Sequence, residues 1–122
     1  MWLTNLYKVY CRIKSMKKFE SKDMFRGWFV GDFEPSSFKT KDCEVAHQKY
    51  KAGDYEQKHM HKVATEITSI IKGKVVMNGI EYQEGDIIVI NPGEATDFKA
   101  ITDAENIVVK VPCVKGDKYL VD

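Results

Sequence analysis

The sequence predicts an all-β domain, either a sandwich or a barrel. From Glu44 onward, short runs rich in β-branched residues alternate with turn residues about every 8–12 positions, which is the spacing of sandwich and barrel folds. One of these turns is Asn78-Gly79, which stands between two apolar runs. This pair is a strong signal for a β-hairpin, because both residues tolerate a positive φ.

Each of the runs expected to be a strand is bounded by residues that end or turn a strand. The runs are 44–51, 65–71, 75–77, 80–82, 86–90 and 106–111, and the turn residues are Gly53-Asp54, Lys72-Gly73, Asn78-Gly79, Glu84-Gly85, Asn91-Pro92-Gly93 and Pro112. The most apolar members of these runs are expected to form the core, namely Ile67, Ile70, Ile71, Val75, Ile87, Val89, Val108 and Val111.

Two segments precede this region. Residues 1–19 carry five basic residues and no acidic one, and their apolar residues stand near helical spacing, so they predict a basic amphipathic extension. We interpret it as a short docking helix or as sequence upstream of a start at Met16; a membrane-surface or targeting helix is the alternative. Residues 20–42 are rich in turn residues and aromatic residues, and we expect them to cover an apolar surface of a single domain spanning 20–122.

Composition excludes several classes of protein. The chain of 122 residues is 43% hydrophobic and 30% charged, as in ordinary globular domains, and no apolar run approaches the ~20 residues that span a bilayer. Residues 20–122 carry a net charge of −4, which provides no electrostatic footprint for nucleic acid. Cys11, Cys43 and Cys113 are far apart, which argues against a disulfide framework or a cysteine zinc site and favours a reducing compartment, the cytoplasm.

Two of the three histidines stand one residue apart, at His59 and His61, and Glu66 follows. Residues two apart in a strand share a face, so both imidazoles would point the same way. Glu66 joins them only if the chain bends between Lys62 and Thr65, so that Glu66 comes from the neighbouring strand. Two imidazoles and one carboxylate suit one divalent ion (Zn, Fe, Mn or Ni) and leave coordination positions open. The alternative is a pair of histidines on a solvated strand face.

The spacing around these residues resembles that of the cupin superfamily. The series Gly53-x5-His59-x-His61-x4-Glu66-x6-Gly73 is similar to the first cupin motif, and the segment from Gly85 to Phe98 is similar to the second. The resemblance covers about residues 44–112. It implies a small double-stranded β-helix barrel (a jelly roll) with a metal in its mouth, held here by His59, His61 and Glu66. It also implies that the chain forms a homodimer.

One position departs from the cupin pattern. The second motif normally supplies a third histidine, and Thr96 stands there instead. A threonine hydroxyl is a poor ligand beside imidazole, so we expect a set of two histidines and Glu66, with water, Asp97 or Thr96 as the candidate fourth ligand. Asp97 would face the other way on an extended strand unless a bulge re-aims it.

Outside the ligand set, the candidates for catalysis are His47, Tyr55 and Asp97. An inward His47 would be a hydrogen-bond partner of a metal ligand or a general base; the alternative is a partly buried, hydrogen-bonded histidine without a catalytic role. Further candidates to line the cavity are Tyr50, Gln57 and Thr68.

The motifs leave three functional hypotheses. In the first, the chain is a metalloenzyme, isomerase/epimerase-like or dioxygenase-like, whose metal polarises a small-molecule substrate or activates dioxygen or water. In the second, it is a non-catalytic module that binds a sugar, nucleotide-sugar or small acid. In the third, the metal only stiffens the barrel, but open coordination positions argue against this because structural metals usually have closed shells.

Overall fold

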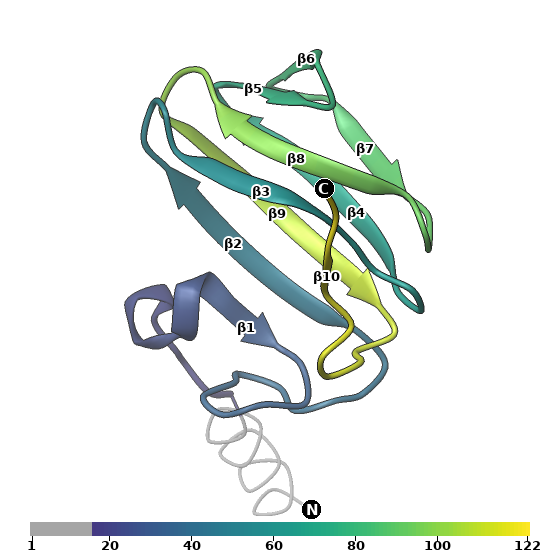
Figure 1. Cartoon of the computed structure of the whole chain (residues 1–122). Coiled ribbons are helices and arrows are strands. Elements are labelled where there is room, and N and C mark those ends of the chain that lie inside the picture. The colour runs from purple at the N-terminus through teal and green to yellow at the C-terminus, as the bar shows by residue number, and fades with distance from the viewer. Residues whose placement is uncertain (1–15) are drawn as a thin grey trace, which may run out of the picture.

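The computed structural model is described for residues 16–122, which form two five-stranded antiparallel sheets packed face to face (Figure 1). The first sheet has the order β1 (Trp28–Val30), β2 (Glu44–Tyr50), β9 (Ala104–Val111), β4 (Thr65–Lys72) and β7 (Ile87–Ile90). The second has the order β10 (Tyr119–Leu120), β3 (Tyr55–Met60), β8 (Ala95–Ala100), β5 (Lys74–Met77) and β6 (Ile80–Gln83). The chain passes back and forth between the sheets, which confirms the predicted all-β jelly roll.

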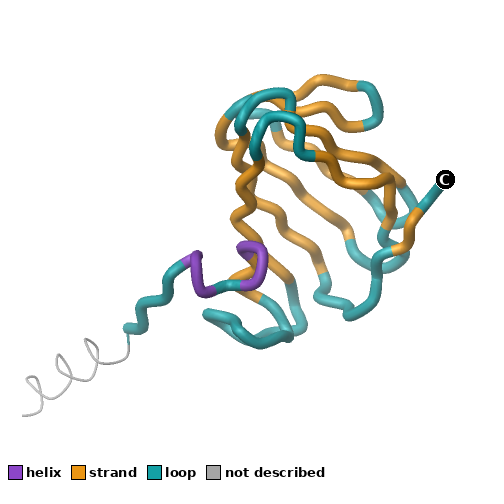
Figure 2. The backbone as a smooth tube through the Cα atoms, turned by 60° about the vertical axis from the view of Figure 1, so that its left-hand side comes forward, coloured by secondary structure: helices purple, strands orange, loops and turns teal. Residues whose placement is uncertain are grey.

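The segment before β2 adds an edge to the first sheet. Two one-turn 3-10 helices, η1 (Ser21–Asp23) and η2 (Phe25–Gly27), lead into β1, which pairs with β2 (Figure 2). None of the helices among residues 16–122 has the length or apolar character needed to cross a bilayer. The expected amphipathic extension lies outside the described residues, apart from its last four, which are exposed coil.

The expected strands are all present, and the Asn78-Gly79 hairpin is confirmed. Asn78 has φ 50° and Gly79 φ 76°, and Met77 pairs with Ile80 across the turn between β5 and β6. The pattern did not predict β1, β8 or β10. The last of these has only two residues, and β8 reads ATDFKA, which has little of the β-branched character that marks strands.

The core lies between the two sheets and is formed by residues of both. Its buried members are Ile70, Val75, Met77, Ile90, Phe98, Ala100 and Ala104. Val108 is buried as well, as expected. For four other residues the expectation was wrong: Ile71, Ile87, Val89 and Val111 are 40%, 67%, 54% and 45% exposed. Ile67 is also outside the core, since it is half-buried on the outer face beside Val89.

The reason for this error is strand geometry, because alternate residues of a strand point to opposite faces. In β7, Ile88 packs against the core, whereas Ile87 and Val89 project from the outer face of the first sheet. An unbroken apolar run such as residues 87–90 does not reveal which of its residues point inward.

Candidate metal centre

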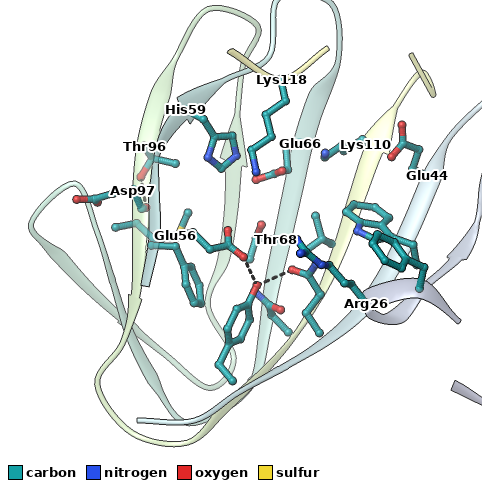
Figure 3. Close-up of a pocket in the computed structure, with 18 of the residues that line it drawn as sticks. Arg26, Glu44, Glu56, His59, Glu66, Thr68, Thr96, Asp97, Lys110 and Lys118 are labelled. Atoms are coloured by element: carbon teal, nitrogen blue, oxygen red, sulfur yellow. Dashed lines mark hydrogen bonds between the residues drawn. The ribbon is translucent and has the colours of Figure 1, made fainter. Parts of the chain in front are cut away.

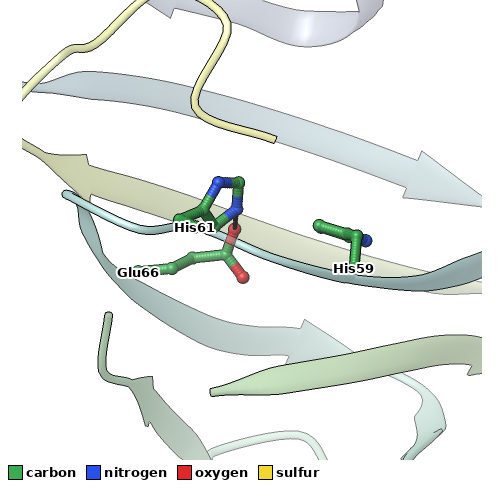
Figure 4. A group of neighbouring side chains, drawn as sticks. All are labelled: His59, His61 and Glu66. Carbon is green, nitrogen blue, oxygen red and sulfur yellow. Dashed lines mark ion pairs between the residues drawn. The ribbon is translucent and has the colours of Figure 1, made fainter. Parts of the chain in front are cut away.

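His59, His61 and Glu66 come together at one end of the barrel (Figure 4). His59 lies near the end of β3, His61 directly follows that strand, and Glu66 is the second residue of β4. The two histidines therefore belong to one sheet and the glutamate to the other. Their candidate ligand atoms all lie within 4.8 Å of one another.

The chain bends between the two strands as the approach of Glu66 requires, and Asp117 fixes the bend. The carboxylate of Asp117 accepts hydrogen bonds from the backbone N–H groups of Lys62, Val63 and Ala64 at 2.8–3.2 Å. Burial raises the pKa of Asp117, but these N–H groups lower it by more, so its pKa lies below the ordinary value. This residue is only 7% exposed, so the bend is held by a buried charge.

The hydrogen bonds of both imidazoles leave their Nε2 atoms free. Nδ1 of His61 donates to the backbone carbonyl of Asp117, and Nδ1 of His59 donates to the carbonyl of Gln57 at 2.9 Å. Because a carbonyl oxygen only accepts, each Nδ1 carries the proton and each Nε2 of a neutral ring has a lone pair. This second hydrogen bond to a backbone carbonyl is the usual arrangement of a metal-binding histidine.

Nε2 of His61 is buried without a hydrogen-bond partner, and it lies 3.4 Å from Oε1 of Glu66. In a neutral ring, its lone pair would face a carboxylate oxygen, which is unfavourable in a buried site. A positive centre between the two atoms, either a proton or a metal ion, removes this conflict. The donor set therefore fits a divalent cation.

Without a metal, a proton on Nε2 of His61 removes the conflict between this atom and the Glu66 carboxylate. When Nε2 of His61 is protonated it donates a hydrogen bond to Glu66, and this raises the pKa of His61 above its usual value, although burial opposes the shift. Burial raises the pKa of Glu66, but the hydrogen bond from His61 and the charge of Lys110 lower it by more, so the net shift is downward. Without a metal, His61 and Glu66 thus form a buried ion pair.

A β-bulge in β3 determines which of its side chains reach the interior. Glu56 pairs with Phe98 and His59 pairs with Thr96, so β3 has one more residue than β8 between these pairs. In a regular strand Glu56 and His59 would face opposite sides. The bulge lets both line the same cavity.

A cavity of about 410 Å³ opens beside the three residues (Figure 3). Its wall carries a hydrogen-bonded group in which Oη of Tyr50 lies 2.9 Å from Oε1 of Glu56 and 2.5 Å from Oε1 of Gln48. Burial and the neighbouring Glu56 raise the pKa of the Tyr50 hydroxyl far above its usual value, so it keeps its proton. Thr68 also lines the cavity, as expected for it and for Tyr50.

The catalytic candidates from the sequence lie elsewhere. Nε2 of His47 bonds to Oε1 of Glu105 at 2.9 Å, and His47 does not line the metal-site cavity. Tyr55 is 60% exposed and borders a separate surface pocket, because the bulge puts Glu56 inside instead. Asp97 borders the cavity but points away from His59, and its Oδ1 accepts a hydrogen bond from the backbone of Asn78 at 2.8 Å.

Gln57 contributes its backbone carbonyl to the site, as the acceptor for His59, and its side chain is not among the cavity-lining groups. Thr96 is buried directly opposite His59, on the neighbouring strand, and lines the cavity. Its hydroxyl donates to the backbone carbonyl of Asp97 at 2.7 Å. The structure does not group Asp97 with the three candidate ligands.

Several residues of the site were not expected from the sequence, among them Glu56, Lys110, Asp117 and Lys118. Glu56 could not be predicted because the bulge reverses the alternation of inward and outward side chains along β3. Asp117 and Lys118 lie more than 50 positions from the histidine motif, in a segment without strand signals. Only the pairing of Tyr119 with Met60 brings that segment beside β3.

No protein-family profile matches the chain, and no curated protein sequence matches it. Solved structures do resemble it. A protein with a double-stranded β-helix domain from Klebsiella pneumoniae is 18% identical, with 89% of this chain and 88% of that chain covered, at a TM-score of 0.66. An RmlC-like cupin from Shewanella frigidimarina is 15% identical, with 62% and 71% covered, at a TM-score of 0.58. The chain has a cupin fold.

A third structure with the cupin fold holds a metal. The bacterial pirin YhhW from Escherichia coli, in complex with nickel(II), is 18% identical to this chain at a TM-score of 0.62. The match covers 80% of this chain and 43% of the pirin.

Proposed function

We propose that this cupin is a metalloenzyme that holds one divalent ion through His59, His61 and Glu66 and acts on a small molecule in the adjoining cavity. The observation that carries the proposal is the buried, unpartnered Nε2 of His61 at 3.4 Å from the Glu66 carboxylate. The nickel(II) in the pirin structure supports a metal on this fold, and Zn, Fe, Mn and Ni all suit two imidazoles and a carboxylate.

A divalent ion in this position would polarise an oxygen of a bound small molecule. The remaining tasks belong to side chains of the chain. The carbonyls of Asp117 and Gln57 keep both imidazoles oriented with Nε2 toward the site. Glu56 is a cavity-lining carboxylate outside the ligand set that would accept a proton from a ligand, and Tyr50 donates a hydrogen bond to it at 2.9 Å.

Elemental analysis of the purified protein tests the proposal. We expect about one divalent ion per chain in the wild type, and a large loss of metal in His59→Ala, His61→Ala and Glu66→Gln. His47→Ala is the matched control, because His47 bonds to Glu105 outside this cavity. Near-zero metal in the wild type after loading with each of the four metals would reject the metal centre.

Catalysis is tested separately with Glu56→Gln. This variant should keep its metal, because Glu56 is not one of the three ligands. Once a substrate is known, its turnover should fall in Glu56→Gln by roughly 100-fold or more, the usual contribution of a general base. Unchanged turnover would remove Glu56 from the mechanism. Binding of the same compound without chemical change would favour a non-catalytic module.

We also propose that the chain forms a homodimer through the outer face of its first sheet. Val89 lies directly beside Ile67, and Ile67 lies beside Val109 on the next strand, so these side chains form a continuous apolar surface. Along β4, β7 and β9, the charged outward residues are Lys72 and Glu105, which are paired at one end of the face. The other outward positions are uncharged, namely Thr65, Ile67, Ser69, Ile87, Val89, Ile107, Val109 and Val111. Exposed apolar surfaces of this kind usually mark protein interfaces.

Two further expectations remain proposals. We place the protein in a reducing compartment such as the cytoplasm, which the free thiols of Cys43 and Cys113 support. We also treat residues 20–122 as one domain, because β1 pairs with β2 and the segment around η2 borders the cavity through Phe25 and Arg26.

A further inference from the structure

Two lysines that line the cavity form no ion pair within residues 16–122. Neither Lys110 nor Lys118 takes part in any of the six ion pairs of this part of the chain. Lys110 lies beside Glu66 on β4 and beside Glu44 on β2, yet its ammonium group stands 4.8 Å from the ring centre of Trp28. The Lys110 ammonium thus lies over an aromatic ring and is not paired with a carboxylate, and Lys118 is exposed, so both can contact a ligand in the cavity.

The contacts that hold the metal centre together also fix the position of Lys118. The preceding residue, Asp117, holds both the ring of His61 and the bend before Glu66. The following residue, Tyr119, pairs with Met60 of β3. Between these two anchors, the side chain of Lys118 extends into the cavity toward His59 and Glu66 (Figure 3).

The charges at this end of the cavity are unbalanced once a divalent ion is present. Over the whole lining, a divalent ion and the three basic residues would balance the five acidic ones, which are Glu34, Glu44, Glu56, Glu66 and Asp97. The positive charges are not evenly spread, however, because Lys118 and Lys110 both lie beside Glu66 at the metal end, whereas Asp97 points away from it (Figure 3). A neutral ligand would leave this local positive excess unneutralised in a partly enclosed space, whereas a carboxylate would satisfy it. Ammonium groups bind carboxylates through charge-assisted hydrogen bonds.

We propose that the cavity takes a small hydroxy acid, whose carboxylate binds the ammonium groups of Lys118 and Lys110 next to the metal centre. This inference rests on the proposed function, since it assumes a bound metal. The hydroxyl groups of the ligand face the polar wall formed by Gln48, Tyr50 and Glu56, which offers hydrogen-bonding oxygens rather than apolar surface. The cavity of about 410 Å³ suits a small molecule of this class.

Calorimetry and thermal unfolding of the metal-loaded protein test this inference with a panel of matched probes. The acids are lactate, gluconate and galacturonate, and the neutral counterparts are sorbitol and galactose. We expect at least one acid to bind and to raise the melting temperature, and its neutral counterpart not to do so. In Lys118→Gln and in Lys110→Gln the affinity for that acid should fall roughly tenfold or more, as expected for loss of a charge-assisted hydrogen bond.

Lys99→Gln is the control, because Lys99 is an exposed lysine of β8 outside the cavity. The metal content of every variant is measured after the titration. If the wild type binds no metal, the proposed function and this inference both fail. If the metal is bound, three results overturn this inference alone: no acid binds, the neutral counterparts bind as tightly, or the lysine variants bind the acid as the wild type does.

Discussion

Asp117 contacts the metal centre in two ways across 56 positions of sequence: its carbonyl holds Nδ1 of His61, and its carboxylate caps the bend that brings in Glu66. One residue thus sets the orientation of one candidate ligand and the position of another. The contact with His61 and the hydrogen bond from the Ala64 N–H are buried, so water does not replace these two when they are lost.

Replacement of Asp117 should therefore affect stability and metal binding together. In Asp117→Ala three backbone N–H groups lose their acceptor, and we expect the free energy of unfolding to fall by about 1–3 kcal/mol. The backbone carbonyl that accepts from His61 remains in this variant, but the bend that positions Glu66 loses its acceptor, so metal affinity should fall roughly 10- to 100-fold. Urea unfolding and metal titration measure the two effects. Lys115→Ala, an exposed neighbour, is the control, and a stable variant with full metal affinity would contradict the role of Asp117.

The stability of the metal-free protein should depend on pH through the buried ion pair. The folded pKa of His61 is raised above 6.5, so its stabilising contribution is present below that pH and is lost as the pH rises through the folded value. The folded pKa of Glu66 is lowered below 4.5, so its contribution is present above that pH and is lost as the pH falls through the folded value. The stability difference between wild type and Glu66→Gln should therefore be largest between about pH 4.5 and 6.5.

Urea unfolding of both proteins at several pH values, in the presence of a chelator, measures this difference. A difference that does not vary with pH would mean that the pair holds no proton. Metal affinity should fall as the pH falls below the folded pKa of His61, because the proton and the metal compete for Nε2.

Thr96→His should complete the usual cupin ligand set. Thr96 is buried opposite His59 on the neighbouring strand and lines the cavity. An added imidazole should tighten metal binding by about tenfold or more, which needs only about 1.4 kcal/mol. The larger side chain should also block entry of the ligand. Thr96→Val, which has no ligand atom, is the control for metal titration, and equal affinity in the histidine variant would show that position 96 does not reach the metal.

Ile87→Lys should separate the proposed dimer. Ile87 is 67% exposed on the outer face of the first sheet, so a charge there should cost the folded monomer little but should disfavour an apolar interface. Ile80→Lys is the control, because Ile80 is 55% exposed on the second sheet. Sedimentation velocity should show a wild-type and Ile80→Lys dimer and an Ile87→Lys monomer. A monomeric wild type would contradict the proposal.

The sequence revealed much of the fold because its turns are explicit. Gly53, Asn78-Gly79 and Gly85 mark chain reversals, and the β-branched runs between them are strands. It also suggested the grouping of His59, His61 and Glu66, because the first two stand two positions apart at the end of β3 and the bend to the third is short.

The surroundings of that group could not be predicted for two physical reasons. The bulge in β3 shifts the alternation of side chains by one residue, so that Glu56 lines the cavity and Tyr55 does not. The contacts of Asp117 and Lys118 depend on long-range strand pairing, which leaves no periodic signal in the local sequence. For the same reason, the outward direction of Ile87 and Val89 could not be read from an unbroken apolar run.

The late position of Asp117 has a consequence for synthesis on the ribosome. His59, His61 and Glu66 emerge long before the residue that orients them, and domains generally fold as units only once their chain is available. A nascent chain that has exposed both histidines therefore still lacks a built metal centre. Metal loading would be the last event in the maturation of this barrel, completed only when the C-terminal segment pairs with β3.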